Sequence, residues 1–143
     1  MSTTTIATLM SRLAALPVKS VKHQYKEPPR SIEKGRLPSQ FPRLPEMDDE
    51  VLTFQANGGL PTLRGDLVVV MEPYAENLNA ANDFSPINFN EAVAMIDNVD
   101  AALRTTRPGT LTEGLASWTI KLEQLTINTE MFWAVVASIS GRG

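Results

Sequence analysis

Proline and positive charge are concentrated in residues 17–45, and this stretch limits the fold more than any other. It holds six of the ten prolines and seven cationic side chains against two acidic ones. Proline fixes φ and has no backbone donor, so the stretch can form neither a long helix nor a central strand. We therefore expect an extended basic arm over residues 17–47 that carries short strands and reaches toward something outside its own domain.

The two parts of the chain carry opposite charge. Residues 1–45 sum to +6 and residues 46–143 sum to −9, which leaves a net charge of −3. Opposite charge in two parts of one chain favours association between copies of that chain. A homo-oligomer is therefore expected.

The composition excludes several kinds of chemistry. The 143 residues predict a single domain, 1–143, large enough to bury a core. There is no cysteine, which excludes disulfides, thiolate metal sites and cysteine nucleophiles. The single histidine, His23, lies in the basic arm, so we expect a surface or interface histidine and no catalytic triad. The N-terminus lacks the pattern of a signal peptide, and no apolar run approaches the ~20 residues that span a bilayer, so no membrane partner is expected.

Hydrophobic spacing predicts the helices. Apolar residues at steps of three and four from Ile6 predict an amphipathic helix that ends before Pro17. A second helix is expected from Asn88 or Asn90 to a point before Pro108. Its outward face carries Glu91, Asp97, Asp100 and Arg104.

The strands are predicted from alternating or continuous apolar runs. We expect them at residues 18–22, 41–47, 51–55, 66–72, 118–128 and 130–140, with a turn at 57–59 and a long polar loop at 73–87. The run at 66–72 indicates a strand buried on both faces. The last two strands form a hairpin, and the alternation in the first of them predicts a break near Glu123.

This order of elements predicts an α+β fold. Hairpin strands with two helices on one face give a mostly antiparallel sheet of about four to five strands, with the basic, proline-rich arm extending from it.

Catalytic and metal sites are weakly indicated. Glu46, Asp48, Asp49 and Glu50 form the densest acidic cluster, and paired carboxylates can bind Mg²⁺, although such a cluster more often solvates a turn. We expect no catalytic residue, no metal and no cofactor. The alternative from another class is a small metal-dependent hydrolase that uses Glu46, Asp48 and Asp49, with the 73–87 loop as a lid.

Two further features bear on partners. The basic arm can neutralise phosphates. Because the net charge is negative and no recognition-helix pattern is present, the only DNA contact that we expect is loose and non-specific, with DNA that passes through a ring of subunits.

Phe132 and Trp133 are adjacent in a strand, so one aromatic side chain should point inward and the other outward. We take Trp133 as a candidate interface anchor.

The succession of motifs resembles the tail terminator (tail completion) proteins of long-tailed bacteriophages. The features that carry this resemblance are the N-terminal amphipathic helix, VKSVK at 18–22, GRLPSQFPRLP at 35–45, the strand near 66–72, the acidic helix AMIDNVDAAL at 94–103 and the closing pair of strands. In that family a leucine–proline segment commonly precedes the first long strand.

The resemblance implies a small α+β subunit that assembles as a hexameric ring on the completed tail tube. The ring stops tube polymerisation and offers a surface to the head connector, so the partners are copies of the chain, the tube protein and the head–tail connector. The protein would be made in the host cytoplasm and lie at the neck-proximal end of the tail in the virion. The interface residues expected under this hypothesis are Arg30, Lys34, Arg36, Arg43 and Trp133. A neck or head-completion protein of the same virion is the alternative, because it shares this size and charge.

Overall fold

The computed structural model describes residues 5–32, 34–48, 62–73, 75–78, 84–87, 89–105, 116–128 and 130–142. Their elements are α1 (Ile6–Ala14), β1 (His23–Gln24), the 3₁₀ helix η1 (Lys34–Arg36), β2 (Ser39–Asp48), β3 (Thr62–Pro73), β4 (Ala75–Leu78), β5 (Phe84–Ile87), α2 (Phe89–Thr105), β6 (Ala116–Ile127) and β7 (Glu130–Arg142). The predicted strand at 51–55 and the predicted turn at 57–59 lie outside the described residues.

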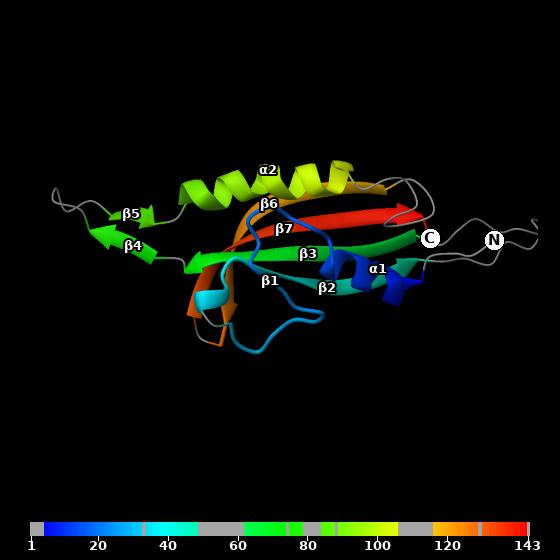
Figure 1. Cartoon of the computed structure of the whole chain (residues 1–143), viewed down its shortest axis with the longest axis horizontal. Helices are drawn as coiled ribbons and strands as arrows, with labels where there is room; N and C mark the ends of the chain where they lie inside the picture. Colours follow the sequence, from blue (N-terminus) through cyan, green and yellow to red (C-terminus); the bar gives the residue numbers. More distant parts are fainter. Residues whose placement is uncertain are drawn as a thin grey trace, which may run out of the picture.

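Five of the strands form one sheet in the order β1-β2-β3-β7-β6. Only the β1–β2 pair is parallel, and the other three pairs are antiparallel. Strands β4 and β5 form a separate antiparallel pair that projects from one end of the molecule (Figure 1). Both α1 and α2 cover the same face of the large sheet, because buried residues of both helices belong to one core. The predicted α+β fold with a mostly antiparallel sheet is therefore confirmed.

The large sheet has a hydrophobic core on each face. The larger core lies between the sheet and the helices and includes Leu13, Leu67, Met95 and Trp133. The smaller core lies on the opposite face, around Val68, Phe41 and Phe132. Residues 67–70 are completely buried, so the prediction that this strand is covered on both sides is confirmed.

The predicted break in β6 is wrong. The strand pairs with β7 without interruption, from Ala116 opposite Gly141 to Ile127 opposite Glu130. Ile120 and Leu122 pack against the larger core, whereas Leu125 packs against the smaller one. The alternation of apolar residues shifts by one position because the first half of the strand buries its side chains on one face of the sheet and the second half buries them on the other.

The helices begin and end as the spacing predicts. Thr5 caps α1, because its side-chain oxygen accepts a hydrogen bond from the backbone N–H of Thr8 at 3.1 Å. Helix α1 packs closely on β3, where a Cβ atom added to Gly65 would collide with the terminal methyl group of Met10. Within the described residues, neither helix is long and apolar enough to span a membrane.

The prediction that residues 17–45 form no central strand is wrong, because the 10-residue strand β2 lies between β1 and β3. Strand β1 pairs only with Ser39 and Gln40, so Pro42 and Pro45 lie where β2 has no partner on that side among the described residues, and they interrupt no hydrogen bonds there.

Two further predictions about strands fail. Residues 18–22 form no strand, because Ser20 has a φ of 74° that turns the chain, and the strand forms at His23–Gln24 instead. The segment 73–87 contains β4 and β5, although its polar composition predicted a loop. The pairing of these strands overrides their polar sequence.

Candidate interaction surface

The basic arm wraps around one edge of its own sheet. Its first part packs against the larger core, where Val18 is buried on the helix side. Strand β1 then adds to the edge of β2, and the chain passes to the other face, where Leu37 is completely buried in the smaller core. The arm therefore touches both faces of the sheet (Figure 1).

Backbone hydrogen bonds fasten the arm along this path. The N–H of Lys22 donates to the carbonyl of Pro38, and the N–H of Tyr25 donates to the carbonyl of Gln40, both at 2.8 Å. A side-chain bond from Gln24 to the carbonyl of Leu16, at 3.1 Å, holds the arm where α1 ends.

The prediction of an arm that extends away from the domain is therefore wrong for most of its length. Tyr25 and Ile32 are partly buried against the smaller core, and Leu37 belongs to it. These apolar residues are widely spaced among prolines and cations, so no periodicity reveals that they are buried. Several parts of the arm remain exposed, among them the short loop that contains Lys26 and Arg30 and the end of η1 at Arg36.

This loop encloses a hollow of about 650 Å³, lined by Tyr25, Lys26, Glu27, Pro28, Pro29 and Arg30. We call it the basic hollow. Lys26 and Arg30 are exposed, and within the described part of the chain neither forms an ion pair. The ring of His23 meets that of Tyr25 edge to face, with centroids 4.4 Å apart, which steadies one wall. The hollow thus offers cations and an aromatic ring to an acidic group.

Two more of the predicted interface residues follow the hollow in sequence. Arg36 is exposed at the end of η1, where its carbonyl accepts a hydrogen bond from the Ser39 hydroxyl at 2.7 Å. Lys34 begins η1, and its side chain lies outside the described residues. Whether these residues contact another subunit stays a prediction.

Arg43 holds strands of its own subunit together. Its guanidinium lies 3.3 Å from the carboxylate of Asp66 on β3 and 3.5 Å from that of Glu123 on β6. Because β6 and β2 are separated by two strands in the sheet order, this bridge crosses the sheet face opposite the helices. The sequence pattern could not reveal these partners, which are distant along the chain.

The prediction that one of two adjacent rings points outward is wrong. Phe132 is 1% exposed and Trp133 is 9% exposed, each in the core of a different face. The alternation of the strand is as expected, but both faces are covered. Trp133 thus packs against the larger core of its own subunit.

The side of α2 that faces away from the sheet is acidic. Glu91 and Asp97 are exposed, and neither has an ion pair among the described residues. Asp100 accepts hydrogen bonds from the indole of Trp118 at 3.0 Å and from Arg104 at 2.8 Å. These bonds, the one from Trp118 first, lower the pKa of the Asp100 carboxyl group. Sequence reasoning missed Trp118 as a partner, since 18 residues separate the two.

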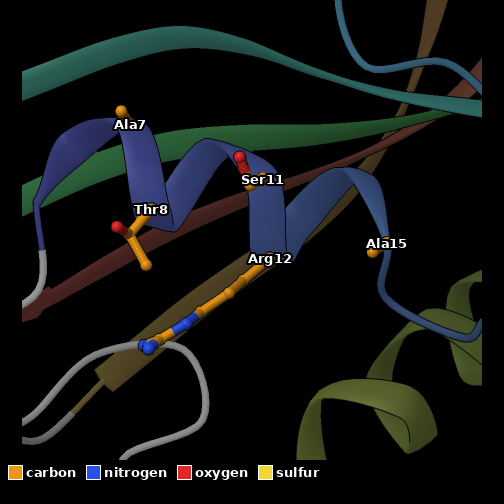
Figure 2. Close-up of a pocket in the computed structure, with 5 residues that line it drawn as sticks. All are labelled: Ala7, Thr8, Ser11, Arg12 and Ala15. Carbon is orange, nitrogen blue, oxygen red and sulfur yellow. The ribbon is translucent and has the colours of Figure 1, made fainter.

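A second hollow, of about 360 Å³, lies beside α1 and is lined by Ala7, Thr8, Ser11, Arg12 and Ala15 (Figure 2). The Arg12 side chain extends away from the helix in this view, and the other lining side chains are short (Figure 2). Only one of the five is titratable, so this hollow offers little chemistry.

The acidic cluster considered for a metal is not assembled in the described residues. Glu46 pairs with Arg64 at 3.3 Å across β2 and β3, while Asp49 and the side chain of Asp48 lie outside the described part. In the ranges that the structure describes, no three His, Asp or Glu side chains come together as a metal site would require.

Comparisons with models of protein families, with curated proteins and with solved structures gave no match.

Proposed function

We propose that this chain is a structural subunit of a bacteriophage virion that caps the tail tube as a ring. The ring ends tube polymerisation and forms the joint to the head connector at the neck-proximal end of the tail. Support comes from the succession of sequence motifs and from the α+β subunit with two helices on one face of a mostly antiparallel sheet. Six copies per ring are proposed from the family resemblance alone.

The observation that carries the proposal is the placement of opposite charges on opposite sides of the sheet. Tyr25 and Ile32, which flank the loop with Lys26 and Arg30, pack against the smaller core, whereas α2, which carries Asp97, covers the larger core on the other face. A contact between two different patches repeats from copy to copy, and it closes into a ring when its rotation permits. Attraction between opposite patches also speeds association and fixes its register.

The proposed contact differs from the one that the sequence alone indicates. Most of the arm packs on its own sheet, so a short loop makes the contact in place of a long reaching segment. In the assembled ring, cations that are not covered by a neighbour would face the lumen, where they give passing DNA a loose, non-specific contact.

The test is a tube-capping assay with the tail tube protein of the same virion. We expect the purified chain to stop tube growth, with a ring at one end of each tube in negative-stain electron micrographs. A triple variant, Arg30→Glu, Lys34→Glu and Arg36→Glu, should lose ring assembly or capping because like charges then face the acidic helix. Lys121→Glu is the control, since Lys121 is an exposed cation on β6.

Three results would change the proposal. A triple variant that assembles and caps tubes at low and moderate salt alike shows that the loop is not the connector. If the wild-type chain does not bind tube protein but binds the head connector, it is a neck or head-completion protein. A monomer that binds neither partner contradicts the structural role, and calorimetric binding of a divalent metal would then favour the hydrolase alternative.

A further inference from the structure

We infer that the basic hollow of one copy receives the outer face of α2 from a second copy, with Arg30 and Lys26 against Asp97. This contact would join neighbouring subunits of the proposed ring. It rests on the proposed function only for the closure of the ring, because the contact itself is a property of this chain.

The hollow has the shape and charge to receive a convex acidic element. Its volume of about 650 Å³ admits several side chains, and its lining combines Lys26 and Arg30 with Tyr25 and two prolines. Prolines keep the loop stiff, so little conformational entropy is lost when a partner enters. One acid, Glu27, also lines the hollow, so two cations face one carboxylate there.

The outer face of α2 is the matching surface. Ala94 and Ala101 are exposed three and four residues from Asp97, so small side chains flank the carboxylate on the helix surface. A guanidinium can therefore approach Asp97 closely and donate two parallel hydrogen bonds. Val93, which is 41% exposed on the same helix, adds apolar area for the tyrosine and proline walls.

The two surfaces lie on opposite sides of the sheet, which sets the kind of assembly (Figure 1). In a two-fold dimer each hollow could meet the helix of the other copy only if both patches lay within one interface, and patches on opposite sides of the sheet do not. A head-to-tail contact places the hollow against the helix at every step and leaves one of each free at the ends. The charge arrangement thus favours a closed ring or an open row of subunits over a symmetric dimer.

Sedimentation velocity of the full chain tests this contact without tube protein. We expect the wild type to associate at about 0.05 M salt and to dissociate at about 0.5 M, because exposed charges are screened. Arg30→Glu and Asp97→Lys should each weaken association by about 100-fold, since each brings like charges together. Lys22→Glu is the control for the first, an exposed cation in the same arm that does not line the hollow.

Glu91→Lys is the control for the second variant. Glu91 is exposed on the same helix but lies about 120° from Asp97 around the helix axis. Mixing Arg30→Glu with Asp97→Lys should restore association, because each variant supplies the wild-type surface that the other lacks and the two altered surfaces also attract. Restoration excludes misfolding as the cause of the loss.

The outcomes separate this inference from the proposed function. If both variants associate like the wild type, or if their mixture stays dissociated, the inference is wrong and another surface joins the subunits. Tube capping by the wild type would then still support the proposed function. A wild-type chain that is monomeric at low salt and also fails to cap tubes overturns both.

Discussion

The side-chain amide of Gln40 donates a hydrogen bond to the carbonyl oxygen of Leu16 at 2.9 Å, and this bond joins β2 to the end of α1. The same nitrogen lies 3.2 Å from the carbonyls of Leu13 and Ala14. Helix ends leave their last carbonyls without helical partners, and here a buried amide from another element supplies them. Gln40 therefore caps α1 from a distance of more than twenty residues.

Replacing Gln40 should destabilise the protein. Gln40→Leu keeps a similar volume but removes the donor that the Leu13, Ala14 and Leu16 carbonyls share. The Leu16 carbonyl keeps its bond from Gln24 and the Leu13 carbonyl keeps one from the N–H of Leu16, so the main cost falls on the Ala14 carbonyl. We expect a loss of about 2 kcal/mol in the free energy of unfolding. The buried Oε1 atom of Gln40, which has no hydrogen-bond partner among the described residues, is removed as well, and this offsets part of the cost. Urea unfolding followed by circular dichroism measures the difference.

Gln24 provides the matched control. Its amide also donates to the Leu16 carbonyl, at 3.1 Å, but Gln24 is exposed and that carbonyl keeps its bond from Gln40. Gln24→Ala should cost about 0.5 kcal/mol or less. Equal losses for the two variants would show that burial of the amide is not what matters.

This cap illustrates what the sequence could predict. The spacing of apolar residues predicted α2 and the strand at Asp66 because local periodicity reports which face of an element is buried. It could not predict that Gln40, a polar residue in a basic segment, is completely buried. Its partners are brought to it by the fold, and no local pattern records them.

The absence of a local pattern for tertiary contacts also explains why the sequence predicted the candidate interaction surface only in part. Prolines and cations in the arm wrongly indicated a segment without a long strand, because the 10-residue strand β2 contains Pro42 and Pro45. The exposed Arg30 was singled out. Burial of Leu37 and the bridge from Arg43 to Glu123 depend on how the sheet bends and on which elements cover each face. These are tertiary properties, so the sequence overstated how far the arm extends.

Asp100 should make stability depend on pH in the acid range. Its pKa is lowered in the folded state by the hydrogen bonds from Trp118 and Arg104. A lowered folded-state pKa contributes stability above the unfolded-state pKa, and that stability is lost as the pH falls through the folded value. Carbon-detected NMR titration of the carboxyl group should therefore give a pKa below the ordinary range, and Trp118→Phe should raise it.

Asp100→Asn is the control for that titration. The amide oxygen can still accept the bond from Trp118, but the group no longer ionises. The variant should lose less stability than the wild type between about pH 5 and about pH 2. Parallel acid denaturation curves for the two proteins would contradict the assignment.

Leu44 is a site where a polar residue should stabilise the fold. It has a φ of 51° at the bulge in β2 and its side chain is 66% exposed, so it carries backbone strain and packs little. Leu44→Asn should raise the free energy of unfolding by about 0.5–1 kcal/mol, because asparagine tolerates the left-handed region. Leu44→Ala, which keeps the strain, should be nearly neutral, and thermal unfolding compares the two.

Arg43 should matter for the isolated subunit. Arg43→Met removes the cation shared by Asp66 and Glu123 and leaves two carboxylates facing each other, so we expect a loss of about 1–2 kcal/mol. Lys121→Ala, which removes an exposed partner of Glu123, should cost less than about 0.5 kcal/mol. A variant with wild-type stability but impaired self-association would instead place Arg43 in a contact between subunits.

Trp133 distinguishes a core residue from an interface anchor. In the structure its ring packs in the larger core with Val135 and Leu67, so Trp133→Ala should cost about 3–5 kcal/mol in the isolated subunit. Met131, two residues earlier on β7 and 41% exposed, is the matched control, and Met131→Ala should cost less than about 1 kcal/mol. Chemical unfolding at a protein concentration low enough to keep the chain dissociated makes the comparison. Removing a side chain that fills the core of its own subunit leaves a cavity there and lowers stability. If Trp133→Ala left the stability of the isolated subunit unchanged and weakened only association, the indole would instead be an anchor between subunits.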